Sequence, residues 1–292
     1  MFGSIFLDLT LPNAASWFYF SFLLAHAVFF KFDRLLTLRN WDLFTLYLLV
    51  PGLLLLMEAH ALQNKLPPEY RNPHSHPALA AETLPEDQEA LLERSDRLLL
   101  VGYIWLIAGS AYFFGRCLFD LGLEKRPELP VNLNLPALAW LGAALFICLT
   151  AAAVRRVPDT PQQVGRGPVA VTKVKDATTA VVELQGETVG WDRSRTSFWV
   201  ERGVAIALHA SVVAALVLIG AVHFRDTSIG VGMAALYLIL PYTAYHVAQV
   251  HHVWPVAFVL WALYAYRSPA AAGAWLGVAA GSAFLPFLLF PL

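Results

Sequence analysis

Polar side chains that could bind a ligand are concentrated in one short stretch, residues 241–255, which lies between two apolar runs. Its candidate substrate-binding residues are Tyr242, His246, Gln249, His251 and His252. Polar groups at membrane depth are costly and normally face a cavity or a partner, so the pattern indicates a polar pocket for the hydroxyls or phosphate of a ligand. Tyr, Trp and His also settle at the membrane boundary because they are amphipathic, so an interfacial belt is the alternative interpretation.

The spacing of these histidines does not predict a metal site. His246 and His251 lie five residues apart, whereas a helical metal pair prefers positions i and i+4. His251 and His252 are adjacent and would point to different sides of a helix. A haem between two membrane histidines is conceivable, but such a histidine is more often hydrogen-bonded within the helix bundle. We therefore expect no metal and no cofactor.

Among the acids of the chain, Glu58 is the first candidate for a catalytic base. It follows an apolar run and lies two residues before His60, where a partly buried carboxylate could act as a general base. A solvated helix end is the alternative interpretation. The chain has no GxxxxGK[ST], GxSxG or HExxH motif and no dinucleotide fingerprint after a strand, which excludes the chemistries that these motifs carry.

The elements that position these residues are long apolar runs. A membrane-crossing helix needs about 20 mostly apolar residues. About eight runs meet or approach that length. They are 14–30, 41–62, 98–119, 135–154, 203–223, 229–247, 253–266 and 270–292. The run at 41–62 contains Pro51, where we expect a kink.

Two polar inserts separate the apolar runs. Residues 1–62 should hold two membrane helices, 63–97 a polar loop, 98–154 two membrane helices, 155–202 a polar insert and 203–292 four membrane helices. The stretch 169–189 alternates and is rich in Val and Thr, which predicts a small β-hairpin turning at 176–179. Arg116 and Asp120 are spaced i and i+4 and should form an ion pair.

Composition supports an all-α integral membrane helical bundle. The 292 residues are 58% hydrophobic and 14% charged, with a mean hydropathy of +0.57. A soluble domain is about half apolar and about a quarter charged. The net charge of −1 offers no basic field for nucleic acid, so the expected partner is the lipid bilayer. The chain is still apolar at Leu292, so either the protein ends within the membrane or a longer chain continues.

The C-terminal region 237–292 carries a series of short motifs in a recognisable order. A small residue and Gln249 open an apolar helix, a basic turn with Arg267 follows, then a small-residue helix, then a proline. The matching positions are 248–249, 267–269, 273–277 and 284–286. This region resembles a segment of the polyprenyl-phosphate-mannose-dependent mannosyltransferases of the GT-C class. The whole chain also resembles uncharacterised bacterial multi-pass membrane proteins that share this region.

The sequence departs from that family at two positions. Ala248 stands where the family has glycine, and the lysine expected before Pro286 is missing. A transferase that uses a lipid-phosphate sugar needs cations for the phosphate and a carboxylate for the acceptor. The cations nearest in sequence are Arg225 and Arg267, and the expected topology places both on the opposite side from Gln249.

The resemblance implies a multi-pass membrane protein, in a bacterial inner membrane, that handles a polyprenyl-phosphate-linked sugar or a similar lipid-linked substrate. The alternative is a non-catalytic membrane scaffold or assembly subunit that binds protein partners at 63–97 and 155–200. The basic residues of the short joints favour an outward-facing N-terminus, whereas a count of all basic residues favours the opposite orientation.

Overall fold

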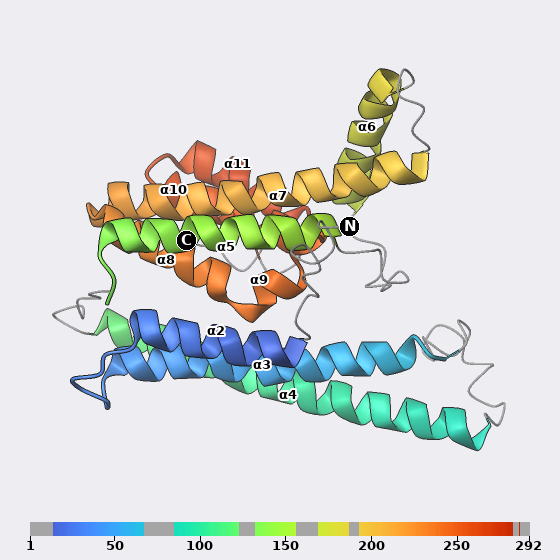
Figure 1. The fold of residues 1–292 in the computed structure, drawn as a ribbon, viewed down its shortest axis with the longest axis horizontal. Coiled ribbons are helices and arrows are strands. Elements are labelled where there is room, and N and C mark those ends of the chain that lie inside the picture. Colours follow the sequence, from blue (N-terminus) through green and yellow to red (C-terminus); the bar gives the residue numbers. More distant parts are fainter. Residues whose placement is uncertain are drawn as a thin grey trace, which may run out of the picture. The chain divides into compact units, whose positions relative to one another are not determined.

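The computed structural model describes residues 14–66, 85–122, 132–155, 169–186, 193–282 and 286, and every regular element in these ranges is helical. The helices fall into two units (Figure 1). One unit holds α2 (Ala14–Phe29), α3 (Leu38–Gln63) and α4 (Glu86–Leu121). The other holds α5 (Leu135–Arg155), α6 (Val169–Gly186), α7 (Arg193–Ile219), η4 (Gly220–Phe224), α8 (Thr227–Ile239), α9 (Pro241–Tyr245), α10 (Val250–Tyr264) and α11 (Pro269–Ala280).

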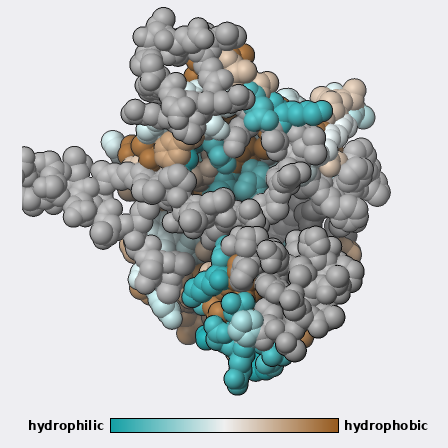
Figure 2. All heavy atoms as spheres, turned by 90° about the vertical axis from the view of Figure 1, so that its right-hand side faces the viewer, coloured by the Kyte–Doolittle hydropathy of each residue, from teal (hydrophilic) through white to brown (hydrophobic). Residues whose placement is uncertain are grey.

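Four of the described helices are long and apolar enough to cross a membrane. Their apolar segments are Leu38–Gln63, Glu86–Asp120, Leu135–Val154 and Thr196–Phe224. The expected all-helical class is thereby confirmed for the described residues, and these four helices are consistent with a membrane protein, whereas the expected number of about eight spans is not confirmed. The other apolar helices are shorter, and they are Ser16–Phe29, Thr227–Ile239, Val250–Tyr264 and Pro269–Ala280. Hydrophilic side chains gather at the helix ends that face the viewer in Figure 2.

The predicted β-hairpin at 169–189 is wrong, because residues 169–186 form the helix α6. The stretch 169–185 contains no Gly, Pro or Asn, so Asp176 has no glycine after it to complete a tight hairpin turn. Thr178 instead donates a helical hydrogen bond to the Val174 carbonyl at 2.8 Å. Val171 packs against Ala205 of α7 and Val250 of α10, so tertiary burial supports the helix where the alternating pattern favoured a strand.

In the first unit, α3 and α4 pack closely through small residues and shared hydrogen bonds. A Cβ added to Gly102 would lie 3.2 Å from the Gly52 carbonyl oxygen, so the two backbones approach at these glycines. The Trp105 indole donates to the Leu48 carbonyl, and the buried Ser95 hydroxyl donates to the Ala59 carbonyl at 3.3 Å. Such contacts between small residues are how membrane helices associate without a hydrophobic driving force.

Arg116 links α3 and α4 at the other end of this helix pair. It forms the predicted ion pair with Asp120 on its own helix. It also makes a two-pronged contact with Asp42 on α3, with Nε to Oδ1 at 3.1 Å and Nη2 to Oδ2 at 3.2 Å. The sequence predicted the local pair, and the structure adds the partner 74 residues away.

The second unit is built around α7. Its continuation η4 leads into a turn where Arg225 adopts a left-handed conformation (φ 56°) and Asp226 caps α8 by accepting from the Ser228 N–H at 2.7 Å. α8 then returns along α7, with Gly220 and Gly230 in close approach. α10 also packs along α7, and α6 projects from the end at which α7 begins (Figure 1).

Candidate functional site

The candidate site is formed where the helical path breaks between α8 and α10. Leu240 has an extended ψ of 133°, as expected for a residue before proline, and Pro241 then starts the short helix α9. After α9 the chain turns through residues 246–248, and Gln249 is extended immediately before α10 begins at Val250. The break therefore gathers the polar side chains of a short segment between two apolar helices.

Four of the five predicted binding residues contact one another at this break. The Tyr242 hydroxyl is hydrogen-bonded to His252 Nδ1 at 2.9 Å, and His246 Nδ1 is hydrogen-bonded to Gln249 Oε1 at 2.8 Å. The rings of His246 and His252 are in contact and tilted by 36°, with centroids 4.0 Å apart. Tyr242 packs against both rings, at 4.6 Å from His246 and 5.9 Å from His252. These four side chains are called the imidazole cluster below.

His251 borders the imidazole cluster. Its ring centroid lies 4.2 Å from that of His252. Within the described ranges, His252 Nε2 is buried and has no hydrogen-bond partner, and the same holds for the indole nitrogen of Trp254. A buried polar atom without a partner is costly, so His252 Nε2 is the atom of the cluster that a ligand would satisfy best.

The surrounding residues hold the break in place. Tyr245, Val247 and Ala248 are buried, and the Thr243 hydroxyl donates to the Tyr237 carbonyl at 2.7 Å. Val253 packs against Val212 of α7. The backbone that carries the imidazole cluster is therefore well packed, which limits the conformations that the side chains of the cluster can adopt.

The register of α10 along α7 shows which end of the unit carries the site. Val250, at the start of α10, packs beside Ala205 in the middle of α7. At the far end of α10, His223 Nε2 donates a hydrogen bond to the Tyr264 carbonyl at 3.0 Å. Arg225 and Arg267 follow these last two residues in the chain, so they lie at the opposite end of α10 from the imidazole cluster.

Glu58 lies on α3 in the first unit, and its side chain is exposed. Its neighbour His60 is hydrogen-bonded to Gln63 at 3.2 Å. The role of Glu58 as a base stays a prediction. Among the described residues, no group of three His, Cys, Asp or Glu side chains is placed to hold a metal ion.

Two buried polar residues of α7 were not predicted as part of a site. Arg202 donates from Nε to the Ala153 carbonyl of α5 at 3.1 Å and lies 3.3 Å from the centroid of the Phe198 ring. His209 Nδ1 is hydrogen-bonded to the Tyr237 hydroxyl at 2.7 Å. The sequence signal was their position inside or at the edge of an apolar run, where an ionisable residue needs a partner.

Comparison with known proteins finds no family model, no curated protein and no solved structure that matches this chain. The geometry of the site is therefore the main support for the function proposed below.

Proposed function

We propose that this chain is a multi-pass membrane protein that binds the polar head of a lipid-linked sugar, of the polyprenyl-phosphate type, at the imidazole cluster. The observation that carries the proposal is the buried His252 Nε2, which has no partner in the described ranges although its other ring nitrogen is bonded to Tyr242. Sugar hydroxyls and phosphate oxygens are suitable partners for such an atom, and aromatic rings can pack on a sugar face.

The proposed topology uses all eight apolar helices. α8 has 13 residues and is about 20 Å long, which is short of the hydrocarbon thickness of about 30 Å. The crossing is therefore completed by α9 and the residues that follow it, and irregular backbone at that depth is tolerated where it lines a polar cavity. This arrangement supports a substrate site at the membrane boundary, in a bacterial inner membrane.

The proposal is for binding, and transfer of the sugar would need a further carboxylate. Glu58 and the acids of 63–97 are the candidates for that role. Related glycosyltransferases of the GT-C class provide the model for such a reaction, through the resemblance of residues 237–292. The imidazole cluster itself supplies hydrogen-bond donors and acceptors that orient the head group.

Binding of polyprenyl-phosphate-mannose to the full chain in nanodiscs tests the proposal. We expect His252→Phe and Gln249→Leu each to weaken binding at least about tenfold, which corresponds to one hydrogen bond of about 1.4 kcal/mol. His60→Phe, at an exposed position of α3, is the matched control and should bind as the unaltered chain does. Unchanged affinity in both site variants, with unchanged melting temperatures, would contradict the proposal.

The scaffold function is the alternative, and one feature favours it. α6 lies in the insert that was predicted to bind protein partners, and it presents exposed side chains such as Lys173, Val174 and Asp176. If no lipid-linked sugar binds and a partner protein is captured through α6 instead, the scaffold function replaces the proposed one.

A further inference from the structure

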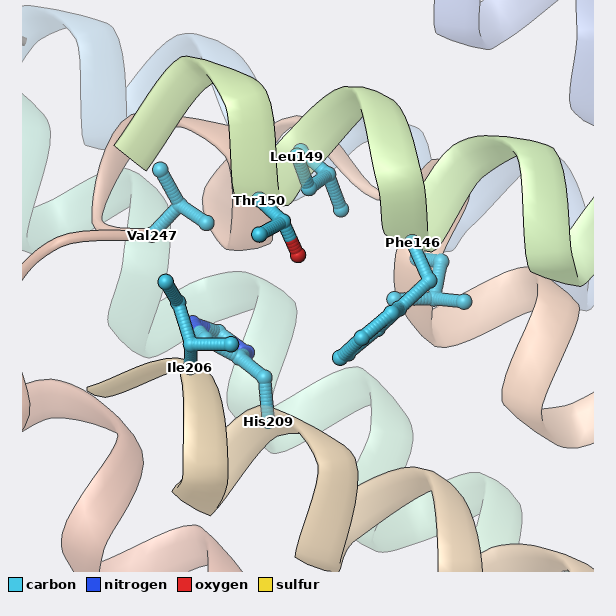
Figure 3. Close-up of a pocket in the computed structure, with 7 residues that line it drawn as sticks. Phe146, Leu149, Thr150, Ile206, His209 and Val247 are labelled. Carbon is cyan, nitrogen blue, oxygen red and sulfur yellow. The ribbon is translucent and has the colours of Figure 1, made fainter. Parts of the chain in front are cut away.

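A small cavity lies among α5, α7 and α8, and it is separate from the imidazole cluster. Its apolar walls include Phe146 and Leu149 of α5 and Ile206 of α7, and Val247 closes one side (Figure 3). It offers about 10 Å³ to a water-sized sphere. That is close to the space needed for one water molecule.

Two polar side chains line this otherwise apolar space. His209 is 96% buried, with 4% of its surface exposed, and its Nε2 has no hydrogen-bond partner in the described part of the chain. The Thr150 hydroxyl of α5 is directed into the same space, facing the side on which the His209 ring lies (Figure 3). An empty cavity is normally apolar, whereas a buried water needs two to four polar partners, so these two groups distinguish this cavity from a dry void.

The hydrogen bond at Nδ1, on the other side of the His209 ring, determines whether Nε2 donates or accepts in the cavity. His209 Nδ1 lies 2.7 Å from the Tyr237 hydroxyl. A phenol hydroxyl is a good donor, and when it donates to Nδ1 the neutral ring carries its proton on Nε2. Nε2–H then faces the cavity beside the Val247 backbone, with which it makes no hydrogen bond of normal geometry, so a better-placed oxygen acceptor would satisfy it.

We propose that the cavity holds one buried water that accepts from His209 Nε2–H and is hydrogen-bonded to the Thr150 hydroxyl. The water would join α7 to α5 through two side chains that do not bond to each other directly. Because Val247 lines the cavity and belongs to the turn between α9 and α10, the water would also support that turn from behind. The proposal does not depend on any ligand of the imidazole cluster.

Substitution at Thr150 tests the water by stability. Thr150→Val removes one hydrogen-bond partner of the water and should lower the melting temperature of the full chain in nanodiscs by about 2–4 °C. Thr150→Ser keeps the hydroxyl and should stay closer to the unaltered chain. Thr178→Val is the control, because Thr178 bonds only to its own helix at an accessible position of α6. In a dry cavity Thr150→Val would leave the melting temperature unchanged or raise it, which would overturn the proposal.

A spectroscopic measurement tests the water without relying on stability. The full chain is labelled with ¹⁵N-histidine, and His209→Gln identifies the His209 signals. We expect a protonated Nε2 that shows magnetisation transfer to a bound water and loses that transfer in Thr150→Val. An unprotonated Nε2, or a protonated Nε2 with no transfer to water in the unaltered chain, would overturn the proposal.

Discussion

Gly230→Ala is expected to lower the free energy of unfolding of the chain by about 2–3 kcal/mol. A Cβ added at Gly230 would lie 2.7 Å from the Val217 carbonyl oxygen and 2.9 Å from the Val217 Cα. Both are backbone atoms of α7, so no side-chain rotation can relieve the overlap. The helices α7 and α8 would have to move apart, which would disturb the turn that leads to the imidazole cluster. Equilibrium unfolding in mixed micelles measures the loss.

Matched controls exist for this substitution. A Cβ added at Gly142 of α5 or at Gly273 of α11 would meet no atom within 4 Å among those described. Gly→Ala in a helix with open space is neutral or stabilising by up to about 1 kcal/mol, because alanine has the higher helix propensity. If Gly230→Ala behaves like these controls, the inference that α7 packs closely on α8 at Gly230 is wrong.

Much of the fold follows from local patterns in the sequence. The apolar runs at 14–30 and 135–154 match α2 and α5 to within a residue at each end, because a run of that length has no stable alternative in a membrane. The hairpin prediction for 169–189 was wrong because the Val and Thr residues alternate there, and a two-residue period considered by itself favours a strand. The contacts of Val171 with α7 and α10 that favour the helix cannot be read from its own segment.

The imidazole cluster could also be predicted from local spacing in the sequence. Tyr242 and His246 are four residues apart, and His252 follows in the next helix, so a single break in the chain brings them together. The bond between His209 and Tyr237 joins positions 28 residues apart on two helices, and it requires the packing of α7 on α8. Local spacing carries no information about such a pair.

Arg116→Met is the second substitution for which we expect a large loss, about 2 kcal/mol of the free energy of unfolding. The Arg116 side chain is 10% exposed and neutralises Asp42 on α3 together with Asp120 on α4. Its removal leaves two neighbouring carboxylates without their cation. Breaking a fully buried ion pair lowers the free energy of unfolding by more than this. Asp42 and Asp120 are 35% and 46% exposed, so water solvates their charges and reduces the loss.

The two carboxylates provide the decisive test of this explanation. In the Arg116→Met chain, Asp42→Asn together with Asp120→Asn removes the repulsion and should restore most of the lost free energy of unfolding. Arg97→Met is the matched control, since its pair with Glu93 is more than 70% exposed on both sides and should contribute less than about 0.5 kcal/mol. If the triple variant stays as unstable as Arg116→Met, lost packing of the long arginine side chain, and not unpaired charge, is what destabilises the α3 and α4 pair.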